Sequence, residues 1–168
     1  MKKLLFMCLS ALHTLIAFTQ NIPSEITSSR PIATGPSVVG IFEGRCPCKE
    51  LAELLKVAVS NECFKTKWSL TLLQDPATKQ PTTYVLEGSF YRANIRQGNW
   101  SILKGIKNDT NAVVYLLDSG NHKEPLFILK GDDNVLFILN KDRSLLVGND
   151  LFSYTFNRVE KKPKTITD

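Results

Sequence analysis

Catalytic and phosphate-binding motifs are scarce in this chain of 168 residues. Of its two histidines, only His122 lies beyond the N-terminal segment, in a stretch typical of a hairpin turn. No zinc-ligand spacing, Gly-rich phosphate loop or strand–turn–helix nucleophile motif is present. A Ser-His-Asp or Cys-His site would have to use His122, while Asp132, Asp133 and Asp142 occur in predicted turns rather than as paired catalytic carboxylates. We therefore expect a protein that is not an enzyme.

Only one long apolar run occurs, and it stands at the N-terminus. Met1-Lys2-Lys3 is followed by an apolar segment from Leu4 to Phe18, the pattern of a signal peptide and too short to cross a bilayer. We predict a signal peptide over 1–19 and an exported, periplasmic or extracellular mature chain with no transmembrane segment. Cys8 lacks the small preceding residue that lipid attachment requires, so no lipid anchor is expected.

Positive charge is in small excess over negative charge. The formal net charge is +5, and +3 without Lys2 and Lys3, too little to indicate nucleic acid as a partner. The mature length of roughly 150 residues suits one domain. Segment 20–37 is rich in Pro, Ser and Thr and is typical of a linker, and 159–168 of a disordered tail. The folded domain is therefore predicted over 38–158.

Within that domain the dominant hydrophobic period is two. In the clearest segment Phe64, Trp68 and Leu72 share one face, as in a half-buried strand. Turn residues separate such segments about every ten residues, and closing the sheet would remove its exposed edges. We predict an all-β fold, a small antiparallel barrel of about eight strands. The predicted strands are Val38–Glu43, Phe64–Leu73, Thr82–Tyr91, Trp100–Gly105, Ala112–Leu117, Leu126–Lys130, Val135–Asn140 and Phe152–Asn157.

One segment near the first strand breaks the period of two. Leu51, Leu54, Leu55 and Ala58 are spaced as on one face of a helix. We predict a short helix over Lys49–Val57 that covers one end of the barrel.

Three cysteines follow the signal peptide, and in an oxidising compartment two should pair. A Cys48–Cys63 bond would close a loop of about 15 residues and contribute roughly 3 kcal/mol, whereas Cys46–Cys63 is the alternative pairing. Left reduced, Cys46 and Cys48 could bind Cu(I) through thiolates. Redox exchange is less favoured because the usual two-residue spacing between its cysteines is missing.

Large aromatic side chains recur on the predicted inward faces. Trp68, Tyr84, Phe90 and Trp100 would either line a ligand cavity or fill the interior of a small barrel. Both alternatives stay open from the sequence.

These elements occur in an order that resembles a known family. A strand ending at Gly44 precedes Pro47-Cys48 and an apolar helical turn, and the chain closes with the patterns 134–142 and Phe152-Ser153-Tyr154-Thr155-Phe156. Over about 38–158 this resembles the N-terminal domain of NlpE, a family of envelope lipoproteins linked with copper resistance and surface-stress signalling.

The resemblance implies a lipocalin-like barrel in a bacterial envelope. It further implies a non-catalytic protein that binds a small apolar ligand or an envelope protein, in a stress response. Pro47-Cys48 corresponds to the first half of the family's Cys-x-x-Cys, and Leu51 stands where the second cysteine would be. We therefore expect no cofactor, with copper on Cys46 and Cys48 as the alternative.

Overall fold

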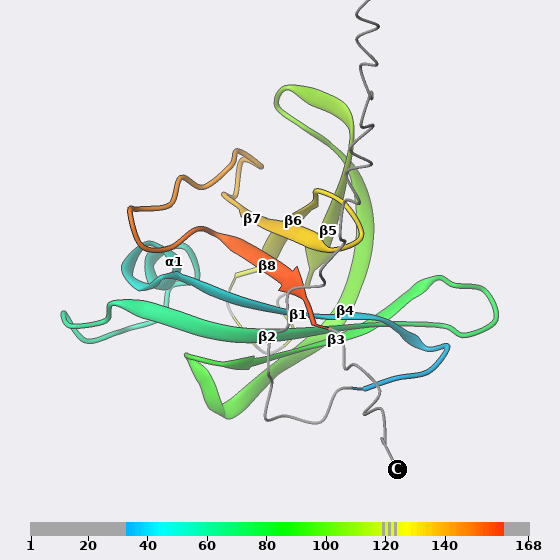
Figure 1. Ribbon diagram of the computed structural model, residues 1–168, viewed down its shortest axis with the longest axis horizontal. Helices are drawn as coiled ribbons and strands as arrows, with labels where there is room; N and C mark the ends of the chain where they lie inside the picture. Colours follow the sequence, from blue (N-terminus) through cyan, green and yellow to red (C-terminus); the bar gives the residue numbers. More distant parts are fainter. Residues whose placement is uncertain (1–32, 119, 121, 123, 160–168) are drawn as a thin grey trace, which may run out of the picture.

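The architecture is a closed barrel of eight antiparallel strands, which confirms the all-β prediction. The computed structural model describes residues 33–118, 120, 122 and 124–159. Each strand pairs with the next in the chain, and β8 returns to pair with β1 (Figure 1). The elements are β1 (Val38–Pro47), α1 (Cys48–Leu54), β2 (Lys65–Gln74), β3 (Pro81–Gly88), β4 (Tyr91–Ile106), β5 (Asp109–Leu117), β6 (Leu126–Lys130), β7 (Val135–Leu139) and β8 (Thr155–Arg158).

The up-and-down order gives the barrel two different ends. The helix end carries α1, the following loop 55–64, the turn between β3 and β4, and the connections β5–β6 and β7–β8. Shorter turns joining β2–β3, β4–β5 and β6–β7 lie at the opposite end. In Figure 1, α1 and the β7–β8 connection, coloured orange, lie on the same side of the molecule. The longest connections of the barrel are thus gathered at the helix end.

Buried and exposed side chains alternate along the strands, and the buried ones form the core. Trp68, Leu70 and Leu72 of β2 are buried, as predicted, and Leu70 pairs with Leu86 of β3 in register. Each such side chain removed from water contributes about 1.5–3 kcal/mol. The apolar cluster takes residues from every strand and from α1, so one shared interior forms.

Two strand boundaries near this core differ from the prediction. Phe64 precedes β2 and is 56% exposed, so its predicted inward position is wrong. The prediction of one strand through Tyr91 is also wrong, because β3 ends at Gly88, which has a φ of +116°, a conformation that glycine adopts without strain. Phe90 consequently lies in a turn and is half-buried, and Tyr91 takes the buried place at the start of β4.

The largest error concerns β4, which spans Tyr91–Ile106 rather than Trp100–Gly105. Its first half is mostly polar and therefore lacks the hydrophobic alternation that identifies a strand. Pairing with β3 nonetheless orders it, with Leu86 opposite Arg96. This register places the Arg96 side chain in the interior, where it is 1% exposed.

Smaller differences affect the ends of other elements. β1 extends to Pro47, so Cys46 belongs to a strand, and α1 ends at Leu54 rather than Val57. Val159 was predicted to begin the disordered tail, yet it is buried and its N–H donates to the Ile41 carbonyl at 2.8 Å. The folded domain therefore includes residue 159. The predicted signal peptide and the rest of the tail lie outside the described residues.

Glycine at position 88 is required for two reasons that can be separated. A Cβ there would overlap the main-chain oxygen of Lys67, and its φ is also positive. Gly35 has a similar φ of +119° but open space around the Cβ position. We expect Gly35→Ala to cost about 1–2 kcal/mol of unfolding free energy and Gly88→Ala about 2 kcal/mol more, measured by urea denaturation. Equal losses would show that the overlap does not matter.

Candidate functional site: the helix end of the barrel

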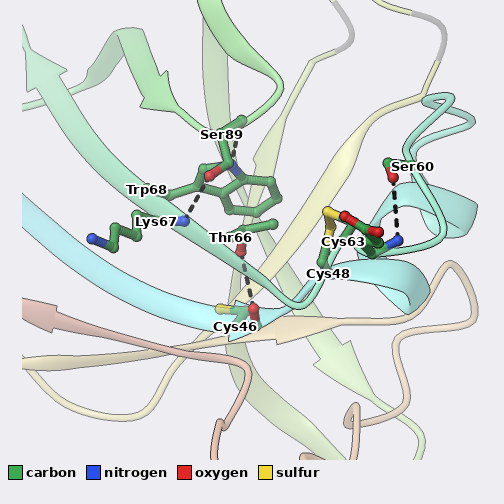
Figure 2. Close-up of a disulfide and its surroundings, with 9 residues drawn as sticks. Cys46, Cys48, Ser60, Cys63, Thr66, Lys67, Trp68 and Ser89 are labelled. Atoms are coloured by element: carbon green, nitrogen blue, oxygen red, sulfur yellow. Dashed lines mark hydrogen bonds between the residues drawn. A yellow bond between two sulfur atoms is a disulfide. The ribbon is translucent and has the colours of Figure 1, made fainter.

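A disulfide anchors the loop that follows α1. Cys48, the first residue of α1, is bonded to Cys63, with Cα atoms 5.7 Å apart (Figure 2). That separation is usual for a disulfide, and the bond confirms the predicted pairing. The Cys46–Cys63 alternative is wrong because Cys63 is already paired. The bond closes the loop 55–64 against the barrel, and Phe64 follows it directly.

Cys46 is the free thiol of the described residues and is buried in β1. Burial raises the pKa of the Cys46 thiol to about 12, although hydrogen bonds from Thr66 and Thr155 oppose the rise. In Figure 2 its sulfur is directed away from the disulfide. The thiol is therefore protonated at neutral pH, which makes it a poor nucleophile and a poor metal ligand.

The disulfide and the buried Cys46 thiol determine whether these cysteines could bind copper. A Cu(I) site on Cys46 and Cys48 needs two thiolates, and the Cys48 sulfur is bonded to Cys63. Within the described ranges no three His, Cys, Asp or Glu side chains gather in a metal-binding arrangement. The donor set of the disulfide-bonded protein does not fit a copper site.

The predicted cavity residues occupy different environments. Trp68, Tyr84 and Trp100 are buried members of the core, and each donates a hydrogen bond to a main-chain carbonyl. These hydrogen bonds fix the three side chains within the core. Phe90 instead lies half-buried at the helix end, with its ring 5.9 Å from that of Trp68 and 6.2 Å from that of Tyr91.

Arg96 is the residue that sequence reasoning missed. Its Nε donates to the Tyr84 hydroxyl at 3.0 Å, and one Nη donates to the Tyr91 hydroxyl at 3.4 Å. The other Nη donates to the carbonyls of Asp118 at 3.2 Å and Glu124 at 2.8 Å. Counting back from Trp100 in steps of two reaches position 96, and this periodicity was the available signal.

The β5–β6 connection lies over Arg96 and is held by ion pairs. The carboxylate of Glu124 pairs with Lys56, which follows α1, and with Lys141 of the β7–β8 connection at 2.9 Å. Hydrogen bonds from these two lysines lower the pKa of Glu124 to about 2. One side chain thus ties together three segments of the helix end.

His122 was predicted to be a solvated turn residue, and the structure shows more contact than that. It is half-buried, and its ring lies 5.0 Å from the Tyr91 ring. Burial, with a smaller effect of the Arg96 charge, lowers the pKa of His122. By contrast, Asp132 and Asp142 do serve their predicted turns, because each accepts hydrogen bonds from main-chain N–H groups two or three residues ahead.

Apolar side chains are exposed mainly on the loops of this end. Among the described residues, five of the seven large exposed apolar side chains lie there, and Val147 is 89% exposed. The Phe64 and Phe152 rings meet edge to face at 5.3 Å and so join the two loops that carry them. We call these five the apolar loop residues: Val59, Phe64, Leu145, Val147 and Leu151. The other two exposed residues are Ile95 and Ile102 of β4.

Comparisons with known proteins give no relative. No family model matches the chain, and neither a curated protein nor a solved structure matches it. In the part of the chain that the structure describes, no helix has the length and hydropathy needed to cross a membrane.

Thiol accessibility tests the assignment of the cysteines. In protein lacking residues 1–19, we expect no thiol to react with an aromatic disulfide reagent in the native state, because Cys46 is buried. One should react in denaturant and three after reduction. Cys63→Ser should lower the unfolding free energy by about 3 kcal/mol, whereas Cys46→Ser should keep the disulfide. A disulfide that persists in Cys63→Ser would contradict the assignment.

The pH dependence of stability tests the Glu124 ion pairs. Because the pKa of Glu124 is lower in the folded than in the unfolded state, its stabilisation is complete above about pH 4.5 and is lost as the pH falls towards about 2. The melting temperature of the native sequence should therefore exceed that of Glu124→Gln at neutral pH, and the gap should close over this window. Glu62→Gln controls for the change in net charge. A gap that is constant with pH would exclude the ion pairs as its cause.

Proposed function

We propose that this protein is an exported, non-catalytic binding module of the NlpE-like kind, which recognises a protein partner of the envelope through the loops of its helix end. The observation that carries this proposal is the concentration of exposed apolar side chains on those loops. Exposed apolar surface in one region of a protein commonly marks an interaction site. A role in envelope stress follows from the resemblance of the sequence.

The anchoring of the loops supports the same function. The disulfide fixes the chain next to Phe64, and Glu124 joins the β7–β8 connection to the loop after α1. A surface held before binding loses less conformational entropy when the partner docks. The disulfide also suits an oxidising compartment outside the cytoplasm.

The second candidate function is binding of a small apolar ligand at the same end. It is favoured by Phe90, whose half-buried ring lies between solvent and the interior rings of Trp68 and Tyr91. Trp68, Tyr84 and Trp100 are buried members of the core. Such a ligand would therefore bind beneath the helix-end connections, next to Phe90. Copper handling is disfavoured, since it requires that the disulfide be reduced.

Site-specific photocrosslinking in intact cells tests the partner proposal. A photoreactive residue at Phe64, Val147 or Leu151 should give one adduct of a single mass, because all three would contact the same protein. The matched controls are Ile95 and Ile102, which are also apolar and about half exposed but lie on β4. They should give no such adduct.

A second variant distinguishes specific binding from crosslinking to a protein that is nearby by chance. Val147→Ser, at the most exposed position, should weaken the adduct formed from position 151 without lowering the melting temperature, because a fully exposed side chain contributes little to folding. Adducts of equal yield from β4 and from the loops, or no discrete adduct from the loops, would refute partner recognition at this end.

A further inference from the structure

The Arg96 guanidinium has partners that do not match its charge. It is 1% exposed, and its four hydrogen-bond acceptors are two tyrosine hydroxyls and two main-chain carbonyls, all of them neutral. Within the described ranges no carboxylate forms an ion pair with it. A buried charge is costly unless an opposite charge accompanies it. The site is therefore electrostatically incomplete.

Asp118 does not complete it. One oxygen of its carboxylate accepts a hydrogen bond from the Asn99 N–H at 3.1 Å. The other is buried against Gly98 and has no hydrogen-bond partner among the described residues. Only the main-chain carbonyl of Asp118 bonds to Arg96. The Asp118 carboxylate thus leaves the positive charge of Arg96 without an ion pair among the described residues.

Two of the four acceptors belong to the β5–β6 connection rather than to the barrel wall. The carbonyls of Asp118 and Glu124 lie on the β5–β6 connection, and both bond to the same guanidinium nitrogen. A guanidinium N–H forms a stronger hydrogen bond to a charged carboxylate oxygen than to a neutral carbonyl. A carboxylate in place of the Glu124 carbonyl would therefore gain charge pairing that the carbonyl does not provide.

The surroundings suit an apolar group attached to that carboxylate. Leu86 lies opposite Arg96 in the sheet, and the Tyr91 ring is flanked by Trp68 at 6.2 Å and by Phe90. The Tyr91 hydroxyl oxygen accepts from Arg96, and its own proton can be donated to an anion, whereas the Tyr84 hydroxyl already donates to the Asp118 carbonyl. Apolar walls with a few convergent polar groups are typical of small-molecule sites.

We propose that Arg96, with the hydroxyl of Tyr91, binds the carboxylate of a small amphipathic acid, such as a medium-chain fatty acid. The acid displaces the Glu124 carbonyl, and its apolar tail lies against the half-buried ring of Phe90. This inference rests on the second proposed function, ligand binding at the helix end, and specifies the class of ligand.

Calorimetric titration at neutral pH with dodecanoate and dodecanol, both below their aggregation concentrations, tests the charge directly. The two probes have the same chain and differ in the head group, so the acid should bind roughly 10- to 100-fold more tightly. Equal affinities would overturn the carboxylate site and leave apolar ligand binding intact. If neither probe binds, both the site and the ligand-binding function are wrong.

Variants assign the selectivity to Arg96. Arg96→Gln should abolish the preference for the acid, while Arg92→Gln, an exposed arginine of the same strand, should keep it. Because Arg96→Gln removes four hydrogen bonds and can unfold the barrel, Tyr91→Phe provides a milder test and should reduce the preference several-fold. Unchanged selectivity in a folded Arg96→Gln or in Tyr91→Phe would refute the proposal.

Discussion

Closure of the barrel between its first and last strands is the constraint on which the rest of the structure depends. The β1–β8 ladder is short, with Phe42 opposite Arg158 and Glu43 opposite Asn157. Arg158 strengthens it, because its side chain donates to the carbonyls of Asp133 and Val39 and lies 4.8 Å from the centre of the Phe42 ring. Without the β1–β8 ladder the sheet would expose two edges, and the buried faces of all eight strands would lose their common interior.

The two ends of the closed barrel differ in how their connections are stabilised. At the end opposite the helix, tight turns stabilised by side chains such as Asp75 and Asp132 are sufficient. The helix end instead has long segments, and α1 has only seven residues with no side-chain cap at Pro47. A helix of that length is unstable alone. It is held by burial of Leu51 and by the disulfide at Cys48, so binding surfaces can occupy this end without weakening the barrel.

The sequence predicts the fold well because the barrel depends on patterns that are local. Alternation through Trp68, Leu70 and Leu72 can be recognised from neighbouring residues alone. The position of the helix between two strands favours the Cys48–Cys63 pair, although the sequence leaves Cys46–Cys63 as an alternative. The polar half of β4 could not be found in this way. Arg96 becomes a core residue because Leu86 of β3 fixes its register, and register between strands is a property of the pair rather than of either segment.

The same reasoning explains why the site was harder to predict than the fold. Phe64 continues the inward period of β2, yet the chain leaves the sheet at the disulfide and its ring packs against Phe152, 88 positions further along the sequence. Arg96 likewise gathers its partners from β3, β4 and the β5–β6 connection. An apolar residue at position 96 would fill the interior at lower electrostatic cost, since buried ions are often replaced by hydrophobic groups without loss of stability. Stability alone therefore gives a weak reason for the arginine, and the neutral acceptors around it provide the physical argument for a negatively charged ligand.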